Sequence, residues 1–379
     1  MTDNDLKRIP MNGSRVIASP TSWIEGEAAR QLDATAALHG VRWAVGMPDL
    51  HPGKGHPIGA AVHGDGVVYP HLVGSDIGCG MALFASTTRV RKFNVQRATK
   101  KLHGLEDAWS GDAEAMLSAH GVVDRAHCTA LGTIGGGNHF AEVQAVNGVA
   151  DQDAFSSLGI DRDCVLLLVH SGSRGFGDKI LRAHTDVRGA RPLVVGTDDA
   201  NAYLRAHDDA VSWGRANRAV IADRFGAALG LELRVVLDVC HNSVSEHDGG
   251  WLHRKGAAPH DRGAIVIPGS RGALSYVVRP TGDGAQCGYS LAHGAGRKWK
   301  RSEARARMRE RYRVGDLVTT DFGSVVICED KDLLFEEAPE AYKKIERVVA
   351  DLVEIGACEI VATLRPVLTY KTRRDVHEE

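Results

Sequence analysis

Short apolar runs rich in β-branched residues recur along this chain without alternating regularly with helical patterns. Such runs predict strands at 41–45, 80–85, 164–169, 233–239, 264–267, 274–278 and 324–328. Apolar residues at helical spacing predict helices at 24–39, 93–120, 197–229, 302–313 and 339–355. Because a doubly wound parallel fold needs regular strand–helix alternation, the pattern favours an α+β fold. We expect one large mixed α/β domain over residues 1–379, with central sheets and helical insertions near 90–125 and 178–230.

Charge and composition exclude several classes of protein. Lys plus Arg is 46 and Asp plus Glu is 48, so the formal net charge is −2 and any nucleic acid would need a local basic patch. No segment approaches the ~20 apolar residues of a membrane span, and the first ten residues lack the apolar core of a signal peptide. The seven cysteines include no CxxC pair, which argues against a disulfide framework. We therefore expect a cytoplasmic protein without a membrane partner.

Residues that can bind metal ions lie beside glycines near the ends of predicted strands. Asp76 and Cys79 precede the strand at 80–85, His139 lies in a glycine-rich stretch, and His170 and His241 follow predicted strands. Ligands at strand ends can converge although they are far apart in the sequence, and this set would suit two divalent ions such as Mn²⁺, Zn²⁺ or Co²⁺. Each residue alone has a plainer explanation, since a buried cysteine or histidine is often only part of a core.

Two glycine-rich loops and a basic segment add chemistry suited to phosphate groups. The loops at 135–139 and 170–175 could present backbone N–H groups to an anion, and Arg174 adds a guanidinium. Small residues around His293 leave room for a bulky phosphorylated group, and nine Lys or Arg residues fall within 297–313. Tight turns and an exposed, salt-bridged helix would explain the same features. Taken together, the features indicate metal-assisted phosphoryl transfer on nucleic acid.

The motifs, in their order along the chain, resemble those of the RtcB family of RNA ligases. The strings DIGCG, GNHF, HSGSRG and HGAGR carry the match, which runs from about residue 41 to 371 and includes MPDLHPGKGHPIGAAV, CHNSV, WLHRKGA, IPGSRGALSYVV and LRPVLTYK. The sequences HPGKGHPIGAA and VGSDIGCGMALF are more similar to the branch of the family associated with release factor H than to the main tRNA-splicing branch. The resemblance implies an enzyme that uses GTP and two Mn²⁺ ions to join an RNA 3′-phosphate or 2′,3′-cyclic phosphate to a 5′-hydroxyl.

The resemblance also implies the metal ligands. Cys79 would bridge the two ions. Asp76 and His139 would complete one site, and His170 and His241 would complete the other.

Roles in catalysis and substrate binding follow from the same resemblance. His293 would be the nucleophile that becomes guanylylated, and Asp49 would orient it. The nucleotide would be bound by Asn138, His139, Phe140, Ala141, Glu142, His241, Asn242, Pro268, Gly269, Ser270, Arg271, Ser275, His293, Gly294, Ala295, Gly296 and Lys371. RNA phosphates would be held by Arg174, Arg297 and Arg301. One departure is Arg271, which stands in PGSRG where the family more often has methionine and adds a charge beside the nucleotide.

The biological setting implied by the resemblance is RNA repair, with tRNA or rRNA as the damaged partner. An archease-type activator and a functional link to release factor H belong to the same expectation. Two alternatives stay open. A metal-dependent phosphodiesterase that opens 2′,3′-cyclic phosphates without ligation would need the metal ligands but not His293. A non-catalytic, translation-associated RNA-binding protein would need neither.

Overall fold

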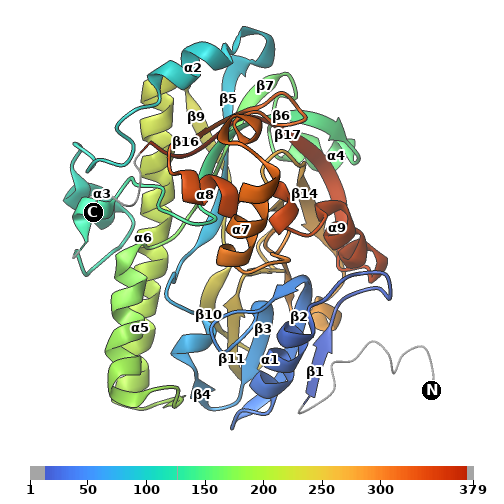
Figure 1. Ribbon diagram of the computed structural model, residues 1–379. Helices are drawn as coiled ribbons and strands as arrows, with labels where there is room; N and C mark the ends of the chain where they lie inside the picture. Colours follow the sequence, from blue (N-terminus) through green and yellow to red (C-terminus); the bar gives the residue numbers. More distant parts are fainter. Residues whose placement is uncertain (1–12, 126, 374–379) are drawn as a thin grey trace.

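Two sheets contain most of the strands in the computed structural model, which describes residues 13–125 and 127–373 (Figure 1). The first sheet has five strands in the order β1-β2-β3-β11-β10, and its β1–β2 pair is parallel whereas the other pairs are antiparallel. These strands are β1 (Gly13–Val16), β2 (Val41–His51), β3 (Ile58–Gly64), β10 (Asn242–His247) and β11 (Gly250–Lys255). The first ten residues, which lack a signal-peptide pattern, lie outside the described part.

The second sheet has eight strands, and most of the predicted metal ligands lie within it or next to the ends of its strands. Its order is β13-β14-β17-β6-β7-β5-β9, with antiparallel neighbours, and β16 pairs with β17 in parallel. The strands are β5 (Gly80–Arg89), β6 (Phe140–Val149), β7 (Cys164–Ser171), β9 (Leu233–Cys240), β13 (Ile265–Pro268), β14 (Ser275–Pro280), β16 (Val325–Cys328) and β17 (Cys358–Thr372). Two short pairs join β4 (Val67–Val68) to β8 (Leu193–Val194) and β12 (Ala257–Pro259) to β15 (Ser290–Ala292). The predominance of antiparallel pairs confirms the α+β prediction.

Helices pack against the sheets, and the longest, α6, runs along the second one (Figure 1). The helices are α1 (Gly26–Ala36), α2 (Val95–Lys101), α3 (Ala113–Ala119), α4 (Gln152–Ser157), α5 (Gly175–Arg188), α6 (Asp198–Leu229), α7 (Arg301–Arg311), α8 (Lys331–Glu336) and α9 (Ile345–Glu354). The side chain of Thr197 caps the start of α6, and Gly230 ends it with a φ of 70°. Phe225 of α6 packs with Phe84 of β5 in a shared core. No helix of the described chain is long and apolar enough to cross a membrane.

The predicted elements are present, but several bounds differ. The strand expected at 41–45 continues to His51. The helical pattern at 93–120 forms two helices, because Asn94 and Asp112 each cap a separate one through a side-chain oxygen. The sequence patterns did not predict β3, β6, β10, β11 or β17. Pro366 lies inside β17, and the register against β6 shifts beside it, which explains why that segment did not resemble a strand.

The topology brings the predicted metal ligands to one edge of the second sheet. Strands β6, β7, β5 and β9 are consecutive neighbours, and antiparallel neighbours bring the start of one strand beside the end of the next. Cys79 precedes β5 and His139 precedes β6, whereas His241 follows β9. His170 was expected just after its strand and instead lies within β7, one residue before its end.

Candidate active site

A compact group of sulfur and nitrogen atoms lies at this sheet edge. Cys79 Sγ lies 3.3 Å from His139 Nε2 and 3.2 Å from His170 Nε2, and all three side chains are buried. The three ligand atoms lie within 4.8 Å of one another, close enough to hold one metal ion. His139 Nε2 also lies 2.9 Å from Asp76 Oδ2. The ring of His241 lies next to that of His170, with centroids 5.2 Å apart. The fold therefore brings together all five predicted ligands.

Hydrogen bonds to the backbone orient two of these histidines as metal ligands. Nδ1 of His139 faces the carbonyl of Ile134 at 3.1 Å, and Nδ1 of His170 faces the carbonyl of Asn138 at 3.2 Å. A carbonyl only accepts, so each Nδ1 carries a proton and Nε2 is the ring atom that faces the cluster. Burial holds the pKa of His170 and of His241 well below the usual value, which keeps these rings neutral.

The acidic and sulfur ligands also fit a cation. Burial opposes ionisation of Asp76, but His139 and Arg174 outweigh it and lower the pKa of that carboxyl. Asp76 Oδ1 is buried and has no hydrogen-bond partner among the described residues. Burial and the Asp76 charge raise the pKa of Cys79, so a bound cation would be needed to deprotonate the thiol. A buried anionic oxygen without a donor, beside several lone pairs, is an arrangement that a divalent ion would satisfy.

His293 lies next to this cluster and is fixed by a buried carboxylate. Its Nδ1 lies 2.7 Å from Oδ2 of Asp49, which is fully buried in β2. The backbone N–H of His293 donates to the same oxygen at 3.3 Å. Gly296 makes the close approach feasible, because a Cβ there would lie 2.2 Å from the Asp49 carbonyl. The His293 and His241 rings are 4.8 Å apart. Nδ1 is thus committed to the carboxylate, which leaves the free lone pair of the ring on Nε2.

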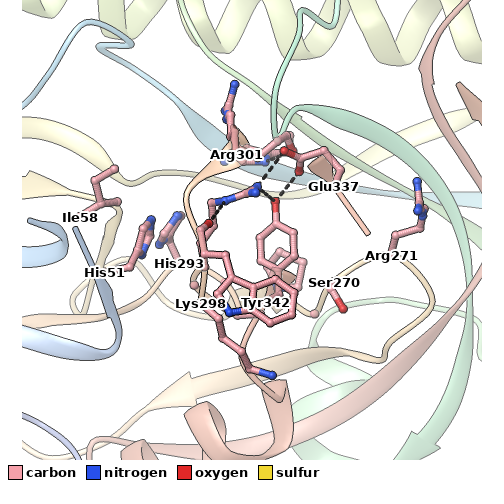
Figure 2. Close-up of a pocket in the computed structure, with 18 of the residues that line it drawn as sticks. His51, Ile58, Ser270, Arg271, His293, Lys298, Arg301, Glu337 and Tyr342 are labelled. Carbon is pink, nitrogen blue, oxygen red and sulfur yellow. Dashed lines mark hydrogen bonds and ion pairs between the residues drawn. The ribbon is translucent and has the colours of Figure 1, made fainter. Parts of the chain in front are cut away.

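A cavity of about 580 Å³ opens in front of His293 (Figure 2). The predicted nucleotide-binding residues that line it are Asn138, Phe140, Glu142, Pro268, Gly269, Ser270, Arg271, His293, Gly294, Ala295, Gly296 and Lys371. His170 lines it as well, so His293 and the group of candidate metal ligands face one space. A volume of this size suits a nucleotide-sized ligand.

Several predicted nucleotide-binding residues lie behind the cavity wall. Ala141 packs in the core of the second sheet. Ser275 accepts a hydrogen bond from Gln144 at 2.8 Å, and Gln144 also donates to Glu142 at 2.7 Å. Asn242 accepts from Gly256 N–H at 2.7 Å and donates to the carbonyl of Asp76 at 3.1 Å. Ser275 and Asn242 therefore act through the groups they hold.

Buried charges concentrate in the cavity wall farther from His293. Glu337 accepts hydrogen bonds from Arg297 Nη1 at 2.9 Å and from the hydroxyl of Tyr342. It also forms an ion pair with Lys371 Nζ at 3.9 Å. Burial lowers the pKa of Lys371, although Glu337 partly offsets this. Burial also disfavours the charged form of Glu142, and therefore raises the pKa of that carboxyl. This wall offers both donors and acceptors to a bound base.

Three predicted RNA-binding arginines differ in their surroundings. Arg174 and Arg301 lie against the glycines of the 135–137 loop, where a Cβ would come within 1.7 Å of Arg174 Nη1 at Gly135 and 2.4 Å of Arg301 Nη2 at Gly137. Gly135 and Gly137 also have φ values of 96° and 68°, so the backbone conformation of the loop requires glycine at these positions and the two guanidiniums lie directly against it. Arg297, in contrast, is held by Glu337 and by the backbone carbonyls of Trp299 and Glu336.

Much of the basic segment after Arg301 is paired with acidic groups. Arg305 and Arg309 bond to Asp332, and Arg307 bonds to Glu303. This is the salt-bridged helix that the sequence left open as an alternative.

Comparisons with known proteins decide the family. The family model described as "tRNA-splicing ligase RtcB" matches residues 31–115 and 110–372. The chain belongs to the RtcB family. It is 47% identical over 363 residues to RNA-splicing ligase RtcB2 of Escherichia coli, with 94% of each chain covered. It is 30% identical to RNA-splicing ligase RtcB of Mycobacterium tuberculosis over 89% of this chain and 99% of the relative. A tRNA-splicing ligase RtcB of Pyrobaculum aerophilum is 28% identical over 87% of this chain and 88% of its own.

Some residues of the RtcB cavity had no sequence signal that singled them out. His51, Glu337 and Tyr342 line it, and Lys343 lies behind it with Nζ bonded to the carbonyls of Pro48 and Leu50. In the sequence, Glu337 looks like a solvent-exposed residue before the helix expected at 339–355, and Tyr342 and Lys343 fall inside that expected helix. His51 stands in the MPDLHPGKG motif of the RtcB resemblance, which could have identified it.

Proposed function

We propose that this chain joins RNA 3′-phosphate or 2′,3′-cyclic phosphate ends to 5′-hydroxyl ends, through a guanylylated His293 and an RNA-3′-pp-G intermediate. The observation that carries the proposal is the Asp49–His293 pair, which opens on the same cavity as His170 of the metal cluster. A plain cyclic phosphodiesterase has no use for an imidazole fixed by a carboxylate in this position. GTP and Mn²⁺ are the expected cofactors.

The first step is the attack of His293 on the α-phosphorus of GTP. Asp49 accepts the Nδ1 proton in a hydrogen bond, so the Nε2 lone pair is directed at the phosphorus. A P–N bond forms and pyrophosphate leaves. Asp76, Cys79, His139, His170 and His241 would hold the metal ions. When bound, these ions neutralise phosphate oxygens and align the reacting groups.

The second step activates the RNA end. A 3′-phosphate offers no leaving group to a 5′-hydroxyl. Transfer of GMP from His293 to that phosphate creates one, because GMP can then depart when the 5′-oxygen attacks. Arg174 and Arg301 beside the 135–137 loop are suited to hold RNA phosphates. A 2′,3′-cyclic phosphate must first be opened by water.

The buried polar wall supports the proposal that guanine is the preferred base. Glu142 can accept from N–H groups of the base, and Lys371 can donate to a base carbonyl. Both face the cavity with the backbone of Asn138 and Phe140 nearby. In this proposal, Arg297 supports the wall through Glu337 and Arg271 supports it through the carbonyl of Leu334, 3.2 Å from Nη2.

We propose RNA repair in the cytoplasm as the biological role, acting on tRNA or rRNA cut by nucleases. An archease-type activator and release factor H are the partners to test. If the role is correct, cells without the protein should accumulate cleaved RNA under nuclease stress, measured by profiling RNA ends.

The test of the activity is covalent labelling with α-³²P-GTP and Mn²⁺, followed by a denaturing gel. A labelled band in the parent that is absent in His293→Ala supports the proposal. Ring-opening of a cyclic phosphate without any labelled band would contradict it and indicate a phosphodiesterase.

A further inference from the structure

His51 lies beside His293 in the cavity and shares its anchor. It ends β2 two residues after Asp49, and Figure 2 shows its ring next to that of His293. His293 is tied through Nδ1 to the Asp49 carboxylate, and His51 is tied through Nδ1 to the Asp49 backbone carbonyl at 2.9 Å. One residue therefore orients two imidazoles, and both line the same cavity.

The anchor fixes the tautomer of His51. A carbonyl oxygen only accepts, so Nδ1 carries the proton and Nε2 has a free lone pair. Among the described residues, Nε2 has no hydrogen-bond partner, and the side chain is 8% exposed. Burial lowers the pKa of His51 to about 4, although the hydrogen bond to Asp49 and the Asp49 charge oppose the shift. The ring thus presents a neutral hydrogen-bond acceptor to the cavity.

The reaction brings few groups that can donate to such an acceptor. Phosphate oxygens are anionic and repel a lone pair. Of the hydroxyls, the RNA 5′-hydroxyl must lose its proton for sealing to occur. We propose that His51 is the general base that takes this proton, an inference that rests on the proposed ligase function.

The proton and bond changes of this step balance. The 5′-oxygen forms a bond to the RNA 3′-phosphorus, and the bond from that phosphorus to the bridging oxygen of GMP breaks. GMP leaves with the electron pair. The hydroxyl proton goes to His51 Nε2, from which solvent later removes it. Bound phosphates bring negative charge beside the ring, which raises its affinity for the proton when it is needed.

Two substitutions distinguish the role of Nε2 as a base from the hydrogen bond that Nδ1 makes to Asp49. His51→Asn keeps an N–H donor for the Asp49 carbonyl but removes Nε2, and His51→Ala removes both. The matched control is His56→Asn. His56 lies five residues after His51, is hydrogen-bonded to the side chain of Thr35, and does not line the cavity. Preformed RNA-3′-pp-G is mixed with 5′-hydroxyl RNA in single turnover, and guanylylation with GTP is measured separately.

The expected result is a split between the two steps. Removing a general base costs about 10²- to 10⁴-fold, so sealing should fall by at least ~10²-fold in His51→Asn, whereas guanylylation stays within about threefold of the parent. Added imidazole should restore part of the sealing by His51→Ala. His56→Asn should seal at the parent rate.

Two outcomes would overturn the inference. Sealing by His51→Asn within threefold of the parent would show that no base is lost. An equal loss of guanylylation and sealing would show that His51 only positions His293. Absence of guanylylation in the parent itself would instead refute the ligase function on which the inference depends.

Discussion

The two sides of the cavity are built differently. On the nucleophile side, which we define as Asp49, His51, His293 and Lys343, hydrogen bonds within the protein fix each ring and the ammonium group. On the ligand side, which we define as Asp76, Cys79, His139, His170 and His241, lone-pair atoms of five side chains crowd together. A buried carboxylate oxygen without a partner among the described residues occurs on both sides, at Asp76 Oδ1 and at Asp49 Oδ1, so it is the crowding of lone pairs that sets the ligand side apart. The nucleophile side is held by protein contacts alone, whereas the ligand side calls for a cation.

This difference separates orientation from charge neutralisation. The nucleophile side orients imidazoles without help from a metal ion, so metal removal should leave its geometry intact. The ligand side should lose both its order and its function when the metal is removed. Substitutions on the two sides should therefore give different combinations of metal binding, stability and activity.

The largest expected effect is the loss of the nucleophile. His293→Ala should abolish guanylylation, because no other lone pair replaces Nε2. Asp49→Asn should reduce it by about 10⁴-fold, the order of loss seen when the carboxylate behind a catalytic imidazole is replaced by an amide. Labelling with α-³²P-GTP measures both. Mn²⁺ binding by calorimetry should remain in each variant, and its loss would show that the two sides are not independent.

The next effect in size concerns the ligand side. Cys79→Ala should lower Mn²⁺ affinity and ligation by at least ~10²-fold, since loss of even an outer-shell partner of a metal ligand costs 10- to 100-fold. Added Mn²⁺ should raise the melting temperature of the parent but not of the variant. Cys164→Ser is the control, because Cys164 is buried at the opposite end of β7. An unchanged response of Cys79→Ala to Mn²⁺ would refute the ligand assignment.

A smaller effect is expected from Lys343, which supports Asp49 from behind. Its Nζ donates to the carbonyls of Pro48 and Leu50 at 2.9 and 2.7 Å, on either side of Asp49. Lys343→Met keeps the length but removes both donors, so Asp49 should shift and guanylylation should fall by about tenfold, the equivalent of roughly 1.4 kcal/mol. Lys343→Arg should recover part of the loss.

Lys343 also gives a pH dependence with a defined sign. Burial lowers its pKa from 10.5 to about 8, although Asp49 partly opposes the shift. Between these values the unfolded chain binds the proton more than the folded protein does, so stability rises with pH. The free energy of unfolding should increase from pH 8 to 10.5, by up to about 3 kcal/mol. Chemical denaturation across this range should show a smaller increase in Lys343→Met; an identical profile would contradict the assignment.

The residue pattern alone suggested the five residues of the ligand side, whereas Asp49 and His293 were paired only through the resemblance. Asp76, Cys79, His139, His170 and His241 each stand near a strand end, and neighbouring strands bring such ends together whatever the rest of the fold does. Sequence order could not show which strands were neighbours. The adjacency of β6, β7, β5 and β9 depends on long-range pairing that no local pattern encodes.

The supporting groups were harder to predict for a physical reason. Glu337 and Lys343 are buried only because α8 and the segment before α9 pack over the cavity. Their side chains are of types that usually lie at the surface, so their burial is a tertiary effect. The sequence suggested anion binding or a tight turn for the glycines at 135 and 137; both have positive φ, as a tight turn needs, and the anion-binding role stays a prediction.

The smallest effect is expected at Arg271, at the wall farther from His293 (Figure 2). Its guanidinium is buried and donates to the carbonyl of Leu334, and Nη1 has no partner among the described residues. Burial lowers the pKa of Arg271, which reflects the cost of a cation in this position. Arg271→Met, which restores the residue more common in the family, should raise the free energy of unfolding by about 1 kcal/mol. Guanylylation should stay within threefold of the parent, because the substitution leaves the nucleophile side untouched. Denaturant unfolding and the KM for GTP test this directly. A tenfold rise in that KM would place Arg271 in contact with the nucleotide and would extend the catalytic machinery across the whole cavity.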